Sequence, residues 1–144
     1  MPIEHLVQGS PITVSADSTV MEAIRVMVDR RIGAVVVTED AKVVGIFTER
    51  DVMKKIVLGG MDAAKTLISQ VMTTEVKSVP RDVSVHRAVE IMKKHHIRHL
   101  PIVNDRDQLL GVVSLRHLLY DMVDDLENQT NSLASYLTAD GIGG

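Results

Sequence analysis

An internal repeat limits the folds open to this chain more than any other feature. The second half of the sequence matches the first half at an offset of 65 residues. Identical pairs at that offset include Val14 with Val79, Asp17 with Asp82, Val20 with Val85, Ala23 with Ala88, Met27 with Met92, Ile32 with Ile97 and Asp40 with Asp105. After one extra residue in the second copy, Gly45 aligns with Gly111 and Thr48 with Ser114. Since the matches fall on apolar positions, turns and helix starts, they indicate two copies of one supersecondary unit.

Each copy predicts a strand, a helix, a two-stranded hairpin and a second helix, in that order. Apolar residues at helical spacing predict the first helix of each copy, and Thr19 and Glu22 suit a capping box. Valine-rich and isoleucine-rich runs bounded by turn residues predict the strands. The expected helices are 19–31 and 84–95, and the expected strands are 12–14, 34–38, 43–47, 78–79, 99–103 and 109–113. A second helix begins at Thr48 or Ser114.

A single copy is too small to bury its apolar strands, so we expect the two copies to pack sheet against sheet. The expected first unit is 1–65 and the second is 66–126, with a helix extension and a flexible tail over 127–144. The last helix exceeds its counterpart and carries a wide apolar stripe of Leu115, Leu118, Leu119, Met122, Val123 and Leu126. This stripe could cap the core or form a dimer seam, and its length favours the seam.

Composition excludes several classes of function. A net charge of −3 and an aromatic share of 2% argue against nucleic-acid binding, which favours basic faces with stacking aromatics. The absence of Cys excludes disulfides and thiolate chemistry. No run of residues suits a membrane helix, and the N-terminus lacks a signal-peptide pattern, so we expect a cytoplasmic protein without a membrane partner. His95, His96 and His99 cluster without a carboxylate beside them, which disfavours a metal site.

The segment from Gly45 to Asp51 carries the most chemical information, because it runs from a strand into a helix. Thr48 is expected to be the N-cap and Asp51 the third helical residue. A helix start offers N–H groups to an anion, and Arg50 adds a charge-assisted donor for phosphate. The Asp51 carboxylate can accept two hydrogen bonds from a ribose diol. The same pattern is also an ordinary N-terminal cap, and the segment alone favours that interpretation.

Within the repeated frame, however, this segment resembles the Gly-hydrophobic-x-Thr/Ser-x-x-Asp signature of CBS motifs, named after cystathionine β-synthase. Supporting marks are Val71-Met72-Thr73 before the second copy and Ile97-Arg98-His99-Leu100-Pro101-Ile102 on its central strand. The resemblance covers residues from about 3 to 126. It implies an α+β (mixed α/β) fold, in which two βαββα motifs related by a pseudo-two-fold axis pack through their sheets and form two clefts.

The resemblance also implies a set of binding residues. Asp51 would hold the ribose hydroxyls, and Thr48 would lie by the ribose and the phosphate. Arg98 and His99 match basic positions on the partner strand that meet the phosphate, and Thr73 and Lys77 match positions that face the ligand. The first cleft would therefore join Thr48, Arg50, Asp51, Thr73, Lys77, Arg98 and His99.

The second cleft departs from the family pattern. Ser114 is acceptable, and Arg116 matches Arg50, but His117 replaces the signature Asp, and a neutral His cannot offer two acceptors to a diol. Gln8 takes the position of Thr73. Gly33 and Ala34 take the positions of Arg98 and His99. We therefore predict one strong nucleotide site and one weak or empty site.

The resulting hypothesis is a regulatory signal-transduction module that senses AMP, ADP or ATP and acts on another protein. It would need no cofactor and would form a disk-like homodimer, as CBS pairs usually do. NADH and S-adenosylmethionine are alternative ligands, since both contain a ribose diol. A protein-interaction module with a vestigial cleft is a second alternative. A nucleotide-hydrolysing enzyme is the least favoured, because the chain has no nucleophile elbow, phosphate loop or metal-ligand pattern.

Overall fold

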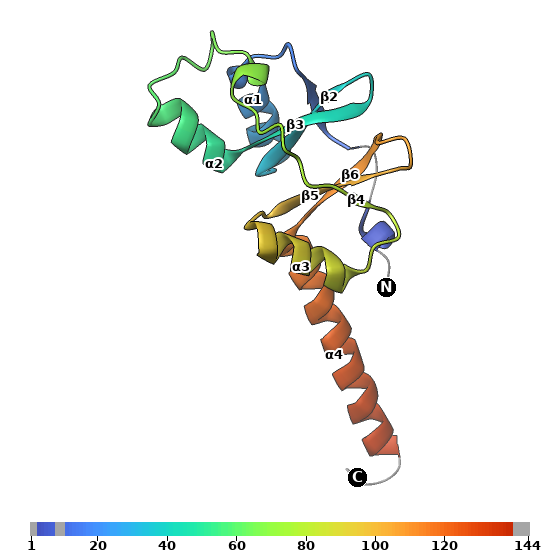
Figure 1. Cartoon of the computed structure of the whole chain (residues 1–144). Coiled ribbons are helices and arrows are strands. Elements are labelled where there is room, and N and C mark those ends of the chain that lie inside the picture. Colours follow the sequence, from blue (N-terminus) through green and yellow to red (C-terminus); the bar gives the residue numbers. More distant parts are fainter. Residues whose placement is uncertain (1–2, 8–10, 140–144) are drawn as a thin grey trace.

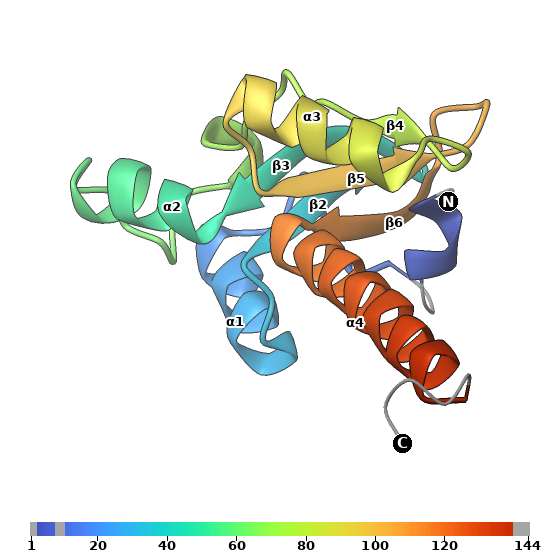
Figure 2. The same ribbon diagram turned by 90° about the horizontal axis from the view of Figure 1, so that it is seen from below.

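The computed structural model describes residues 3–7 and 11–139, which form a mixed α/β structure with two three-stranded sheets (Figures 1 and 2). In both sheets the first strand runs parallel to the middle strand, which pairs antiparallel with the third. The first sheet contains β1 (Thr13–Ser15), β2 (Ala34–Glu39) and β3 (Lys42–Thr48). The second contains β4 (Val79–Pro80), β5 (His99–Val103) and β6 (Leu109–Ser114). The predicted fold class is confirmed, and the strands match the expected ones to within a residue or so at each end.

The first helix of each copy is fixed by its caps. In α1 (Val20–Arg30), the Thr19 hydroxyl accepts from the Glu22 N–H at 3.1 Å, and the Glu22 carboxylate accepts from the Thr19 N–H at 3.2 Å. This is the predicted capping box. In α3 (Val85–His95), the Ser84 hydroxyl accepts from the Arg87 N–H at 3.1 Å.

The second helices of the two copies differ strongly. The first is a short α2 (Glu49–Asp51) that continues as a π-helical segment, η2 (Val52–Val57). Its wider winding is visible in the hydrogen bond of 3.0 Å from the Leu58 N–H to the Met53 carbonyl, five residues back. The other is α4 (Leu115–Ala139), with 25 residues. The prediction of a longer last helix is confirmed.

Each copy has its own hydrophobic core, and the short segment that precedes each copy enters the core of the other. Ile68, in η3 (Ile68–Gln70), packs in the first core, and its N–H donates to the Ser18 carbonyl at 2.7 Å. Ile3, in η1 (Ile3–Leu6), packs in the second core, and its N–H donates to the Val83 carbonyl at 2.7 Å. The two copies are therefore interlocked.

Two glycines of the repeated pattern permit this crossing. A β-carbon on Gly45 would collide with the Met72 side chain, which follows η3. A β-carbon on Gly111 would lie 2.7 Å from a methyl group of Val7, which follows η1. The hairpins of the two sheets also meet, because the Leu109 N–H donates to the Ala41 carbonyl at 3.3 Å. Within the described residues, no helix has the length and hydropathy needed to cross a membrane.

Candidate functional site

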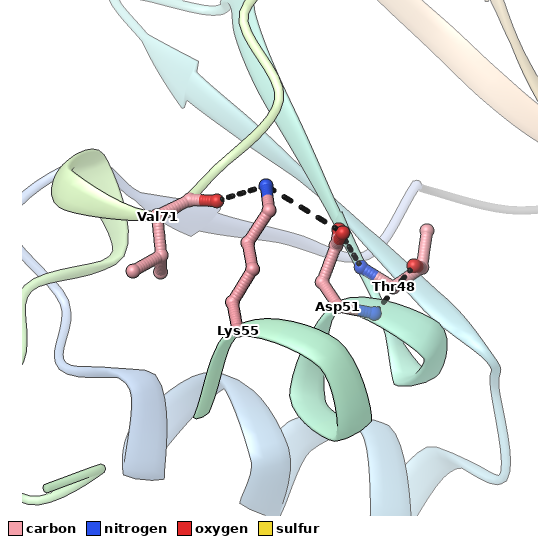
Figure 3. A network of polar contacts seen from close by, with 4 residues as sticks. All are labelled: Thr48, Asp51, Lys55 and Val71. Carbon is pink, nitrogen blue, oxygen red and sulfur yellow. Dashed lines mark hydrogen bonds and ion pairs between the residues drawn. The ribbon is translucent and has the colours of Figure 1, made fainter. Parts of the chain in front are cut away.

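The residues predicted for the first cleft centre on the junction between β3 and α2. The Thr48 hydroxyl accepts from the Asp51 N–H at 3.2 Å, and the Asp51 carboxylate accepts from the Thr48 N–H at 3.0 Å (Figure 3). Thr48 is thus the N-cap and Asp51 the third helical residue, as predicted. The capping role of both residues is real, so any ligand role comes in addition to it.

Asp51 has a second neighbour that the sequence analysis missed. Its other carboxylate oxygen lies 3.6 Å from the Lys55 ammonium, which also donates to the Val71 carbonyl at 2.6 Å (Figure 3). The Asp51 side chain is 15% exposed. Because a carboxylate has about four lone-pair sites, these two partners leave acceptor capacity on the exposed edge. The i,i+4 spacing of Asp51 and Lys55 is a sequence signal that could have revealed this ion pair.

Thr73 lies beside the same junction. Its N–H donates to the Ile46 carbonyl and its carbonyl accepts from the Ile46 N–H, both at 2.9 Å. This pairing adds the linker to the edge of β3, two residues before Thr48. The exposed side chain of Thr73 therefore belongs to the same region as Thr48 and Asp51.

His99, from the second copy, lies near the start of α2. A β-carbon on Gly33 would lie 3.4 Å from the His99 ring and 3.3 Å from the Glu49 carboxylate. The Glu49 N–H donates to the Gly33 carbonyl at 3.0 Å. The pKa of His99 is lowered, mainly by burial and further by Arg98, while Glu49 raises it. The exposed Glu49 thus lies near a predicted site residue.

The other basic residues of the predicted set lie on the surface. Arg50, Lys77 and Arg98 are exposed, and no polar contact joins them to Asp51 in the described part of the chain. Lys77 lies near the end of α3. There, loss of hydration lowers the pKa of His95, and the charges of Lys77 and Lys94 lower it further. The structure therefore joins Thr48 directly to Asp51 and pairs Thr73 with the same strand, at Ile46. It brings His99 close to the start of α2. The side chains of the three cations extend into solvent.

A cavity of about 290 Å³ lies along the linker, next to this site. Its walls come from β3, the linker and the second hairpin, namely Lys42, Val43, Val44, Thr74, Val76, Ser78, Val103 and Asp107. None of the seven predicted residues lines it. Its volume is close to the lower limit of common ligand pockets, about 300 Å³. Four of the eight wall residues are valines, which in a strand are indistinguishable from ordinary core, and the four polar ones form no motif in the sequence.

The residues predicted for the second cleft are arranged differently. The Ser114 hydroxyl caps α4 by accepting from the His117 N–H at 3.1 Å, but the exposed His117 supplies no carboxylate. The Arg116 guanidinium turns to Tyr120 instead, with its carbon 5.6 Å from the ring centroid. Gln8 lies outside the described residues. Among the described residues, no group of three or more His, Cys, Asp or Glu side chains could hold a metal ion.

Comparison with known proteins agrees with the repeat. The sequence pattern of the CBS domain matches residues 3–58 and 68–124. The CBS domain-containing protein CBSX3, mitochondrial, of Arabidopsis thaliana is 31% identical over 134 residues, which cover 90% of this chain. The chain spans 65% of that relative's length.

Solved structures share the fold. The CBS domain protein PAE2072 from Pyrobaculum aerophilum, complexed with AMP, is 26% identical with a TM-score of 0.79, covering 90% of this chain and 99% of that one. The CBS domain pair of protein MJ0100, in complex with 5′-methylthioadenosine and S-adenosyl-L-methionine, has a TM-score of 0.79 and covers 87% of this chain and 98% of its own. At 23% identity, that second likeness concerns the fold alone.

Proposed function

Because this chain belongs to the CBS domain family and carries two copies of that domain, we propose that it is a regulatory module that binds an adenine nucleotide beside Asp51. The observation that carries the proposal is the carboxylate of Asp51, held at a fixed strand-to-helix junction with an exposed edge. A ribose diol can donate two hydrogen bonds to such an edge. The AMP bound by the Pyrobaculum relative supports this class of ligand.

Phosphate recognition must depend on side chains more than on the helix start. The N–H groups of Glu49 and Asp51 already donate to Gly33 and Thr48, so they have little to offer an anion. We therefore assign the phosphate to Arg50, Lys77 and Arg98, whose exposed side chains are free to move toward it. His99, neutral because burial lowers its pKa, would contribute one hydrogen bond rather than a charge.

The finer features of the proposal follow from the same residues. AMP, ADP and ATP are the preferred ligands, and NADH and S-adenosylmethionine are the alternatives that share the ribose diol. We propose a non-enzymatic sensor that works in the cytoplasm as a homodimer and signals to a partner protein. A protein-interaction module with a vestigial cleft is the competing function.

The decisive experiment is a thermal-shift titration of the full chain with these five compounds. A ligand that binds only the folded state raises the melting temperature by mass action. We expect a shift with at least one adenine nucleotide and no shift in Asp51→Ala.

Glu22→Ala is the matched control, because it breaks the equivalent capping box on α1 and leaves the cleft intact. Both variants should melt lower than the wild type, since each loses one of the two hydrogen bonds of a capping box. Only Glu22→Ala should keep the ligand shift. The absence of any shift in the wild type would favour the interaction module, and a shift retained by Asp51→Ala would remove Asp51 from the site.

A further inference from the structure

Lys55 connects the candidate site to the linker between the two copies, residues 71–78. Its ammonium donates to the Val71 carbonyl at 2.6 Å and lies 3.6 Å from the Asp51 carboxylate (Figure 3). The first distance is that of a short, charge-assisted hydrogen bond, whereas the second is an ion pair too long to be one. Lys55 is therefore anchored on the linker and stands beside Asp51 without occupying a lone pair of its carboxylate.

The Val71 carbonyl depends on this lysine. Val71 directly follows η3 and is buried in the first core. No backbone N–H of the described residues donates to its carbonyl, and a buried backbone carbonyl without a partner is costly. In the part of the chain that the structure describes, no other side-chain hydrogen bond or ion pair joins residues 49–57 to the linker. Lys55 is therefore the polar connection between the two segments.

The linker carries the anchored carbonyl close to a predicted ligand residue. Thr73 comes two residues after Val71 and pairs with Ile46 of β3 through two hydrogen bonds of 2.9 Å. Because the chain between Val71 and Thr73 is so short, a displacement of the Val71 carbonyl must also strain the pairing at Thr73. Lys55 thus helps to set the position of Thr73 relative to Asp51.

The second copy repeats this contact with different chemistry. In that copy Asp121 takes the position of Lys55, 66 residues later, and its carboxylate lies 3.3 Å from the ring of His5. His5 belongs to η1, which enters the second core as η3 enters the first. In each copy, therefore, this position of the second helix contacts the segment that crosses between the copies. Only the first copy adds a carboxylate one turn earlier, because His117 replaces Asp51 in the second.

We propose that Lys55 is a positioning residue through which ligand binding at Asp51 is coupled to the linker. The inference rests on the proposed function and adds the route by which binding changes the rest of the chain. A ribose that donates to Asp51 is held beside Lys55, which is bonded to Val71. Because coupling between two sites is reciprocal, a linker fixed by Lys55 strengthens ligand binding, and a bound ligand restrains the linker.

The first test compares Lys55→Met with Lys54→Met by isothermal titration of the full chain with AMP. Both variants lose one charge from the same helical segment, but Lys54 is exposed and only Lys55→Met loses the bond to Val71. We expect about tenfold weaker binding for Lys55→Met and unchanged binding for Lys54→Met. Lys55→Arg should restore binding, because its guanidinium can donate to both partners. Equal binding by Lys55→Met and the wild type would overturn the inference.

Adenosine, which has no phosphate, separates positioning from direct contact. Lys55→Met should weaken the binding of adenosine and of AMP by the same factor. A loss confined to AMP would mean that Lys55 contacts the phosphate itself, and this result would also overturn the inference. A wild type that binds none of the five compounds of the thermal-shift titration would overturn the proposed function as well, so the two failures are distinguishable.

The second test is hydrogen exchange, measured by mass spectrometry on peptides that cover residues 66–72, which precede the linker residues assigned to the ligand. Saturating AMP should slow exchange there in the wild type and in Lys54→Met. In Lys55→Met, also saturated with AMP, the slowing should be absent. Circular dichroism verifies that each variant remains folded. Slowing that persists in Lys55→Met would exclude Lys55 as the route.

Discussion

At the scale of single residues, Asp51 combines an observed structural role with the ligand role that we propose for it. One oxygen accepts from the Thr48 N–H, and the other faces the Lys55 ammonium. These contacts fix the rotamer of the carboxylate before any ligand arrives. Preorganisation of this kind reduces the entropy that binding must overcome.

The close approach of the linker to Gly45 predicts the cost of adding a side chain at that position. A β-carbon there would overlap the Met72 side chain, so Gly45→Ala should destabilise the protein by about 1–3 kcal/mol through overpacking. In a Met72→Ala background only the β-carbon of residue 72 remains nearby, at 3.2 Å, and the same substitution should cost much less. Denaturant unfolding of the two single variants and the double variant measures this coupling. Additive losses would mean that the linker does not press on β3.

The burial of His99 predicts how the free energy of unfolding depends on pH. Burial lowers its pKa below the ordinary value of 6.5, so the unfolded chain binds more protons than the folded chain just below that value. The free energy of unfolding therefore rises with pH in this range and falls as the pH is lowered through 6.5. His99→Gln should flatten this dependence, whereas His86→Gln, at an exposed position on α3, should not. An unchanged slope in His99→Gln would show that the ring is not buried in solution.

At the scale of elements, the caps and the apolar spacing carried nearly all of the predictive information. Thr19 with Glu22 and Thr48 with Asp51 were readable because a capping box is local chemistry. The π-helical winding of η2 was not readable, because one extra residue per turn hardly changes the apolar spacing of six residues. The cavity walls were missed because their four valines resemble ordinary core residues and their polar members, Lys42, Thr74, Ser78 and Asp107, form no recognisable motif.

The end of α4 makes a prediction about an element. A chain that stops after Asp125 keeps Leu118 and Met122 on the core but loses Leu126 and the seam beyond it. It should remain folded and keep its response to nucleotide, yet its melting temperature should no longer depend on protein concentration. Thermal melts over a range of concentrations, beside the wild type, measure this. A truncated chain that fails to fold would mean that the end of α4 is part of the core.

At the scale of the whole molecule, the 65-residue offset predicted two similar units but not how they are joined. Ile68 precedes the second repeat, and it could have packed on its own repeat or on the other. The structure shows the second arrangement, and Ile3 repeats it in the opposite sense. Contacts between the two repeats decide which core each isoleucine enters. The sequence of one repeat, taken alone, does not include those contacts.

The two copies differ at the residues that we propose bind the ligand. This difference predicts the number of nucleotides bound per chain. The first cleft has the carboxylate of Asp51 and lies near His99, whereas the second has His117 and no side chain beyond a methyl group at Gly33 and Ala34. Isothermal titration with AMP should therefore give one site per chain. His117→Asp should add a weaker second site and a second capping bond, since an Asp there can accept from the Ser114 N–H as Asp51 does from Thr48. Two equal sites in the wild type would mean that the carboxylate does not select between the clefts, and binding would then depend on the surfaces that both copies share.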